Sequence, residues 1–141
     1  MKNILLFLLY TSFHTGFAQD TTAVDDEAVT SENVIKVPFG KMTEIERMSI
    51  KVIEVVDSRC PSDVECVWAG EVIASVLIFK NGAFQQNQDI RINSVLNAEN
   101  LLFEDNNQRL YIVSTSPYPK VSNGGIKQTD YIFNVVLKEI E

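Results

Sequence analysis

Residues 71–83 read EVIASVLIFKNGA, and this stretch decides the fold. Its first nine residues, Glu71–Phe79, are almost continuously apolar and rich in β-branched side chains, which is typical of a buried central strand. The Asn81-Gly82 pair follows, and both residues accept the positive φ angles of a two-residue hairpin loop. We therefore predict a β-hairpin whose return strand runs over Phe84–Ile92.

Segments of the same character lie on both sides of this hairpin. Residues 48–56 (MSIKVIEVV) alternate apolar and polar side chains, so we expect a half-buried strand. Residues 109–115 (RLYIVST) and 130–138 (DYIFNVVLK) predict two further strands. The loop 116–125 between them carries prolines and glycines, which interrupt strands. Val34–Phe39 is the expected first strand.

Together these segments predict an all-β fold. We expect a single small β-sandwich, immunoglobulin-like or barrel-like, of about seven strands, spanning residues 34–141. Pro38 suggests that the first strand lies at a sheet edge. Residues 94–103 (SVLNAENLLF) fit a strand, a loop or one helical turn, and their pattern does not choose among these.

Residues 1–18 predict a secretory signal peptide. Lys2 supplies a positive charge, Ile4–Tyr10 supply an apolar core, and Gly16-Phe17-Ala18 provide small residues for cleavage after Ala18. The apolar run is far shorter than the ~20 residues that span a bilayer. We therefore expect cleavage and a periplasmic or secreted location, without stable membrane insertion.

The segment after the predicted cleavage site is acidic. Residues 19–33 (QDTTAVDDEAVTSEN) predict a disordered leader ahead of the folded domain, and a solvated linker is favoured over an acidic docking tail. Removal of residues 1–18 takes away Lys2 but no acidic residue, so the formal net charge of −7 becomes −8. This charge argues against nucleic acid and anionic membrane surfaces as partners.

The chain has a single histidine, His14, and it lies in the predicted signal peptide. The mature chain would have no imidazole to transfer protons, which excludes Ser-His-Asp and Cys-His catalysis. Zinc and copper sites built on imidazole are excluded for the same reason. We expect neither a catalytic residue nor a bound metal or cofactor.

The two cysteines are Cys60 and Cys66. In an oxidising compartment, a pair at this spacing predicts a disulfide. Closing so short a loop stabilises a fold by roughly 2 kcal/mol in the chain-entropy treatment. The alternative is a redox pair of the Cys-x-x-Cys kind, but five intervening residues, including Pro61, do not match that motif.

The most specific segment is residues 57–71 (DSRCPSDVECVWAGE), which holds the single tryptophan of the chain. Its DSRCP and CVWAG runs, with the later Pro117-Tyr118-Pro119 and Tyr131-Ile132-Phe133, resemble a group of small exported bacterial proteins and lipoproteins of unknown function. The resemblance covers most of residues 45–138. It implies an exported β domain with a disulfide and brings no activity. The sequence lacks the lipidation cysteine of the lipoprotein members, so membrane tethering is not implied.

This loop has a structural and a functional interpretation. In the structural one, the disulfide pins the loop, Trp68 covers one end of the core or packs against the bridge, and Gly70 permits a bulge. In the functional one, a rigid loop presents Arg59, Trp68 and Tyr118 to a partner. Arginine and aromatic residues are favoured at binding hot spots.

The loop carboxylates add two alternatives. Asp57, Asp63, Glu65 or Glu71 could form an oxygen-ligand cation site, most plausibly for Ca²⁺, although no Asp-x-Asp-x-Asp spacing is present. Asp57 and Glu71 could also serve as the paired carboxylates of a hydrolase, ~5–10 Å apart. A domain this small offers little room for a substrate cleft.

We therefore predict an exported, non-enzymatic binding module with a disulfide-stapled loop. The expected partner is an envelope or extracellular protein, peptide or glycan. A carboxylate-based hydrolase or a cation-binding envelope protein is the alternative. The candidate binding residues are Arg59, Trp68, Tyr118, Asp57, Asp63 and Glu71.

Overall fold

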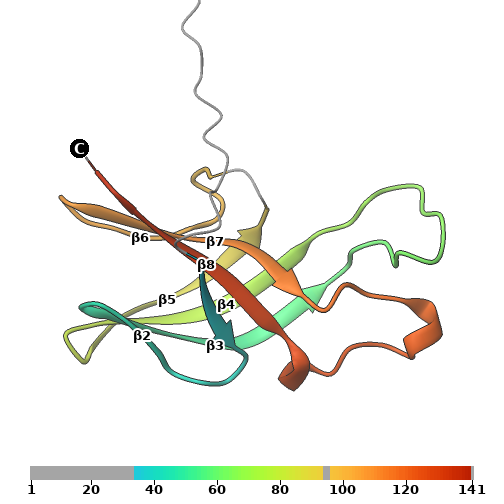
Figure 1. Cartoon of the computed structure of the whole chain (residues 1–141), viewed down its shortest axis with the longest axis horizontal. Helices are drawn as coiled ribbons and strands as arrows, with labels where there is room; N and C mark the ends of the chain where they lie inside the picture. Colours follow the sequence, from blue (N-terminus) through green and yellow to red (C-terminus); the bar gives the residue numbers. More distant parts are fainter. Residues whose placement is uncertain (1–33, 94–95, 141) are drawn as a thin grey trace, which may run out of the picture.

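The computed structural model describes residues 34–93 and 96–140, and the predicted signal peptide and acidic leader lie outside them. The described residues form two antiparallel sheets of four strands each (Figure 1), which confirms the predicted all-β, sandwich-like fold. One sheet has the order β1-β8-β7-β6 and the other β2-β3-β4-β5. The strands are β1 (Val34–Pro38), β2 (Thr43–Ile45), β3 (Met48–Asp57), β4 (Val72–Lys80), β5 (Ala83–Ile92), β6 (Leu101–Glu104), β7 (Gln108–Ser116) and β8 (Ile132–Glu139).

Six of these strands coincide, within two residues at each end, with segments predicted from the sequence. The other two are β2, which was not predicted from the sequence, and β6, which takes up the end of the undecided stretch 94–103. The first two residues of that stretch lie outside the described residues. Strand β8 begins at Ile132 rather than Asp130 because Gln128–Asp130 forms a 3₁₀ turn (η3), closed by a bond from the Tyr131 amide to the Gln128 carbonyl.

The core lies between the two sheets. Strand β4 pairs with β3 on one side and β5 on the other, which confirms its predicted central position. Its buried side chains alternate with partly exposed ones, so one face of this strand packs inward. Burial of large aliphatic and aromatic side chains stabilises a fold by about 1.5–3 kcal/mol each. The largest fully buried side chains include Ile50, Ile78, Ile90, Leu102, Leu110, Ile112 and Phe133.

Two hairpins have two-residue loops. In the β4–β5 hairpin, Lys80 pairs with Ala83, and Asn81 and Gly82 have φ angles of 50° and 78°, as predicted. In the β2–β3 hairpin, Ile45 pairs with Met48, and Glu46 has a φ of 55°. Left-handed backbone costs a non-glycine residue about 1–2 kcal/mol, so Glu46 is an unusual choice for this turn.

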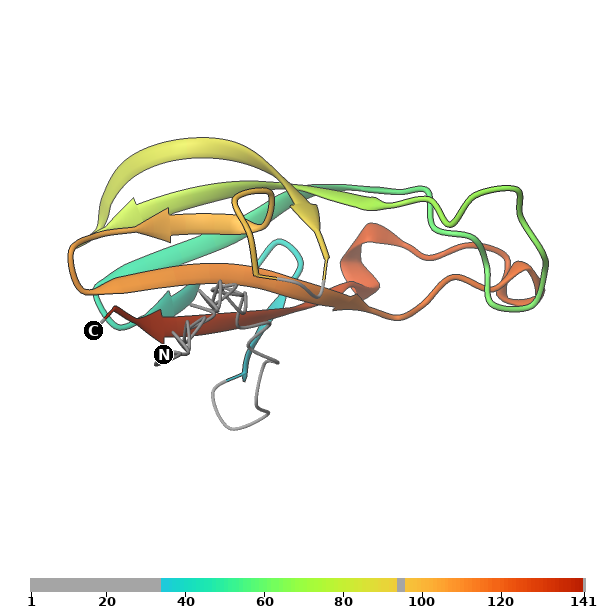
Figure 2. The same ribbon diagram turned by 90° about the horizontal axis from the view of Figure 1, so that it is seen from above.

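Two connections leave the sheets at the same end of the molecule. Residues 58–71 join β3 to β4, and residues 117–131 join β7 to β8. Figure 2 shows that both extend well beyond the strands and run side by side. The Ser62 amide donates a hydrogen bond to the Pro119 carbonyl at 3.0 Å, which joins them directly. We call these two connections together the finger.

Candidate functional site

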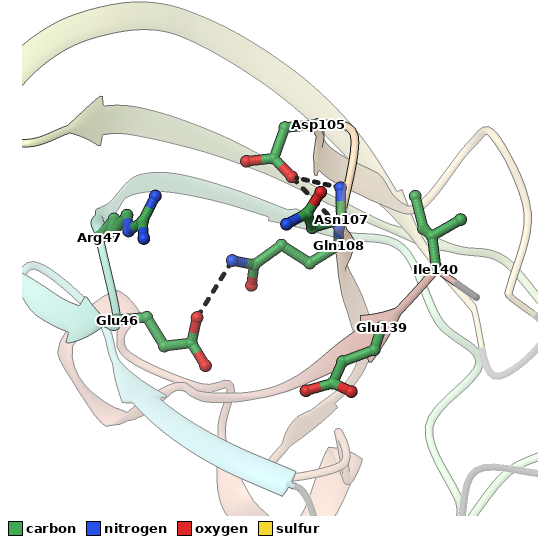
Figure 3. A pocket seen from close by; sticks show the side chains of 7 residues that line it. All are labelled: Glu46, Arg47, Asp105, Asn107, Gln108, Glu139 and Ile140. Atoms are coloured by element: carbon green, nitrogen blue, oxygen red, sulfur yellow. Dashed lines mark hydrogen bonds between the residues drawn. The ribbon is translucent and has the colours of Figure 1, made fainter.

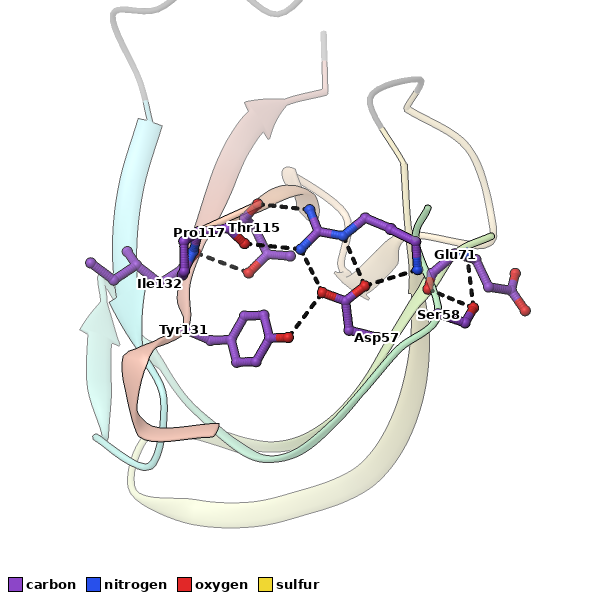
Figure 4. A network of polar contacts seen from close by, with 8 residues as sticks. Asp57, Ser58, Glu71, Thr115, Pro117, Tyr131 and Ile132 are labelled. Carbon is purple, nitrogen blue, oxygen red and sulfur yellow. Dashed lines mark hydrogen bonds and ion pairs between the residues drawn. The ribbon is translucent and has the colours of Figure 1, made fainter. Parts of the chain in front are cut away.

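An ion pair between Asp57 and Arg59 forms the base of the finger (Figure 4). Arg59 Nη2 donates to Asp57 Oδ2 at 2.6 Å, and Arg59 Nε donates to Oδ1 at 2.9 Å. The Arg59 side chain is only 13% exposed, and the Asp57 side chain is only 8% exposed. Because Asp57 ends β3, the start of the finger is anchored to the sheet at this pair.

Arg59 also reaches the other connection of the finger. Its guanidinium donates to the carbonyls of Thr115 at 3.3 Å and Pro117 at 3.0 Å, and it lies 4.6 Å from the centre of the Tyr118 ring. The Tyr131 hydroxyl, from just before β8, donates to Asp57 Oδ2 at 2.9 Å. The Asp57–Arg59 pair therefore connects the two sheets as well as the two halves of the finger.

The environment keeps Asp57 ionised. Burial by itself raises the pKa of this carboxyl, but hydrogen bonds from Arg59 and Tyr131 outweigh it and hold the pKa below its usual range. Burial and the bond to Asp57 raise the pKa of the Tyr131 phenol from 10 to about 12. A pocket of about 320 Å³ opens beside this network. Both Asp57 oxygens already accept hydrogen bonds, so this group is poorly suited to act as a general acid.

The raised phenol pKa makes stability depend on alkaline pH. The folded state favours protonated Tyr131, so its contribution is complete below pH 10 and is lost as pH rises towards 12. We expect the free energy of unfolding to fall over this interval, with a shallower fall in Tyr131→Phe. Urea unfolding followed by circular dichroism at several pH values measures both. Equal slopes for the two proteins would contradict the assignment.

Asp63 holds the second connection of the finger. Its two carboxylate oxygens accept bonds from the backbone amides of Val121 at 2.8 Å and Ser122 at 3.0 Å. These amides begin the 3₁₀ turn η2 (Val121–Asn123), and their bonds lower the pKa of Asp63 to about 2. The Asp63 carboxylate is thus used to join the two loops.

The first connection is fixed along its length. Cys60 and Cys66 form the predicted disulfide. The Cys60 amide donates to the Ala69 carbonyl at 2.7 Å, and the Ser58 amide donates to the Glu71 carbonyl at 2.8 Å, which extends the pairing of β3 with β4 into the finger. Gly70 has a φ of 70°, and a Cβ at this position would lie 1.8 Å from the Ser58 carbonyl oxygen.

The finger carries large apolar side chains in water. Val67 is 95% exposed and Trp68 is 81% exposed. The structural interpretation that Trp68 covers the core or packs against the disulfide is therefore wrong. The side chains of Val64, Tyr118 and Val121 are also exposed. We call these five residues the finger surface.

Glu71 does not meet Asp57. Asp57 pairs directly with Val72, whose side chain is buried in the core, so Asp57 and Val72 share the inner face of the sheet. The neighbouring Glu71 points to the opposite face, and Figure 4 shows its carboxylate directed away from Asp57. It forms an exposed ion pair of 2.8 Å with Arg91. The paired-carboxylate geometry that a hydrolase needs is not present between these two residues.

The six predicted binding residues thus fall into three groups. Asp57, Arg59 and Tyr118 form one network, Asp63 joins the two loops, and Trp68 and Glu71 face solvent. Neither the role of Tyr131 nor the exposed valines were predicted from the sequence. The adjacent Val67 and Trp68, two large apolar residues in a loop dense in charged side chains, were the available signal.

Comparison with known proteins returned no match to a family model, to a curated protein or to a solved structure. Within residues 34–93 and 96–140, no three cysteine, aspartate, glutamate or histidine residues are grouped so that they could hold a metal ion. No helix in the described part of the chain is long and apolar enough to cross a membrane.

Proposed function

We propose that this chain is an exported, non-enzymatic binding module that contacts its partner through the finger surface. The observation that carries this proposal is the exposure of Val67 and Trp68, at 95% and 81%. These side chains project from a loop whose backbone is held by a disulfide and by hydrogen bonds. Leaving large apolar side chains in water is unfavourable, and such surfaces commonly mark interaction sites. The partner is an envelope or extracellular protein, peptide or glycan.

The rigidity of the finger supports this function. The disulfide, the Asp57–Arg59 pair and the bonds from Asp63 hold both loops in one conformation before any partner arrives. A pre-ordered loop loses less conformational entropy on binding than a mobile one. In this proposal Asp57, Arg59 and Asp63 position the finger, while Trp68 and Tyr118 make contact.

The location is part of the proposal. We infer that residues 1–18 direct export and are removed, which places the domain in the periplasm or outside the cell. The Cys60–Cys66 disulfide is the kind of bond that persists in those compartments. The resemblance of the loop to small exported proteins agrees with this location.

A site-specific crosslinking experiment tests the finger as the contact surface. A photoreactive phenylalanine analogue is placed at Val67 or, as a control, at Phe84, which is also exposed but belongs to β5. Each protein is exported in its own host and irradiated in intact cells. We expect a discrete adduct from position 67 and none from position 84. The same pattern from both positions would contradict the proposal.

Trp68→Ala gives the corresponding affinity prediction. Trp68 is exposed, so this change should alter the free energy of unfolding by no more than about 0.5 kcal/mol. Loss of a tryptophan at the centre of an interface costs about 2 kcal/mol or more, so binding to the crosslinked partner should weaken at least about thirtyfold. Isothermal titration calorimetry with that partner measures the effect. Unchanged affinity in a folded Trp68→Ala protein would exclude the finger surface as the main contact.

A further inference from the structure

A polar pocket of about 440 Å³ (Figure 3) lies between turns at the end of the molecule opposite the finger, as the arrangement of the strands in Figure 2 shows. It is formed where three segments meet: the β2–β3 turn, the β6–β7 turn and the end of β8. Its volume lies within the range of small-molecule sites, but apart from Ile140 its walls are charged and amide side chains. The polar residues that line it are Glu46, Arg47, Asp105, Asn107, Gln108 and Glu139.

Hydrogen bonds hold the walls of this pocket in place. Asp105 Oδ1 accepts bonds from the amides of Asn107 at 3.0 Å and Gln108 at 3.1 Å, which fixes the β6–β7 turn. The Ile140 amide donates to the Asn107 carbonyl at 2.8 Å and ties the end of the chain to that turn. Gln108 Nε2 donates to Glu46 Oε2 at 3.0 Å, which links the β6–β7 turn to the β2–β3 turn. The turns that bound the pocket are therefore fixed before any ligand binds, while the side chains of Arg47 and Glu139 extend from them as exposed groups.

Charges of opposite sign face this space without pairing to each other. In the part of the chain that the structure describes, neither Arg47 nor Glu139 takes part in an ion pair, although both line the pocket. Figure 3 shows Glu46, Gln108 and Glu139 pointing into the same space, with Arg47 at one side. Among the described residues, the pocket thus offers a guanidinium and a carboxylate that form no ion pair, around a space of about 440 Å³.

The backbone of Glu46, which lines the pocket, is unusual for a residue with a side chain. This residue adopts a φ of 55° in a two-residue turn, a conformation for which glycine is the usual choice. Strained conformations of this kind are concentrated at ligand-binding and catalytic positions. A glycine at this position would present only a hydrogen atom to the pocket, whereas Glu46 presents a carboxylate.

We propose that this pocket binds a small zwitterion bearing one ammonium and one carboxylate group, as in a free amino acid or a short peptide. Arg47 would bind the carboxylate through its planar fork of donors. Glu139 and Glu46 would bind the ammonium. Within the described residues no group of three ligating side chains is placed to hold a metal ion, and the three lining carboxylates would repel an inorganic anion. This site is separate from the finger and does not depend on the function proposed for it.

Nuclear magnetic resonance with matched ligands tests this proposal. The full chain, expressed with its own leader and labelled with ¹⁵N, is titrated with glycine and with glycylglycine, which distinguish a free amino acid from a peptide. N-acetylglycine lacks the ammonium and glycinamide lacks the carboxylate, so these two serve as controls. We expect saturable shifts of the Arg47, Asn107 and Gln108 amides, with a dissociation constant of about 1 mM or tighter, for at least one zwitterion.

Variants assign the two charged contacts. Arg47→Gln and Glu139→Gln should each weaken zwitterion binding at least about tenfold, because each removes one charge-assisted contact. Arg91→Gln removes an exposed arginine at the finger end of β5 and should leave binding unchanged. Dispersed spectra establish that each variant is folded. The proposal is overturned by absence of saturable shifts, by equal binding of N-acetylglycine or glycinamide, or by full affinity in Arg47→Gln.

Discussion

Replacing Gly70 by alanine should destabilise the domain by about 3 kcal/mol. The left-handed backbone contributes about 1 kcal/mol of this cost, and the overlap between the new methyl group and the Ser58 carbonyl contributes the rest. That overlap is severe, because the Cβ would lie 1.8 Å from the carbonyl oxygen. To relieve this overlap, the two sides of the loop 58–71 must move apart. That movement breaks the hydrogen bonds between Ser58 and Glu71. Thermal or urea unfolding followed by circular dichroism measures the change.

Gly40 is the matched control for this prediction. Its φ is also 70°, but a Cβ at that position meets no atom within 4 Å. Gly40→Ala should therefore cost only the backbone contribution of about 1 kcal/mol. Equal losses in the two variants would mean that close approach to Ser58 is not what requires glycine at position 70.

Asp57→Asn should cost about 3 kcal/mol. The change keeps the shape of the side chain but leaves the Arg59 guanidinium, which is 13% exposed, without its counter-charge. Removing one partner of a buried ion pair is far more costly than the net contribution of the pair, because the remaining charge is poorly solvated. Since the guanidinium also binds the Thr115 and Pro117 carbonyls, we expect the finger to loosen at its base. Equilibrium unfolding and amide hydrogen exchange in residues 58–71 measure these effects.

An exposed ion pair in the same protein provides the comparison. Arg109 and Glu104 lie 2.8 Å apart with side chains 43% and 44% exposed. Glu104→Gln should cost at most about 1 kcal/mol, since water and salt screen such pairs. If Asp57→Asn were no more destabilising than Glu104→Gln, the Asp57–Arg59 pair would not be the anchor that its geometry indicates.

The sheets were largely predictable because their strands are long enough to show a pattern. Strands β3, β4 and β8 contain eight to ten residues, and buried positions recur along them with little interruption. Strand β2 has only three residues, Thr43–Ile45, which is too short for alternation to be visible. Its conformation depends on pairing with β3, a contact that the local sequence does not encode.

The candidate site was predicted in part, and the errors have one physical origin. Sequence spacing placed Asp57 and Arg59 in a charged loop and predicted the disulfide between Cys60 and Cys66. It did not show that Arg59 turns inward, because its other partners come from residues more than fifty positions away in the chain. Tyr131 was missed for the same reason. Exposure of Trp68 is likewise decided by what the rest of the fold leaves uncovered.

The exposure of Trp68 also determines how this protein can be observed. It is the single tryptophan of the chain and is 81% exposed in the folded state, so its indole is in water both before and after unfolding. The wavelength of tryptophan emission should therefore change little when the domain unfolds, so tryptophan fluorescence will not report unfolding well. The same indole will respond when any molecule covers the finger, which makes it a built-in reporter of binding instead of folding.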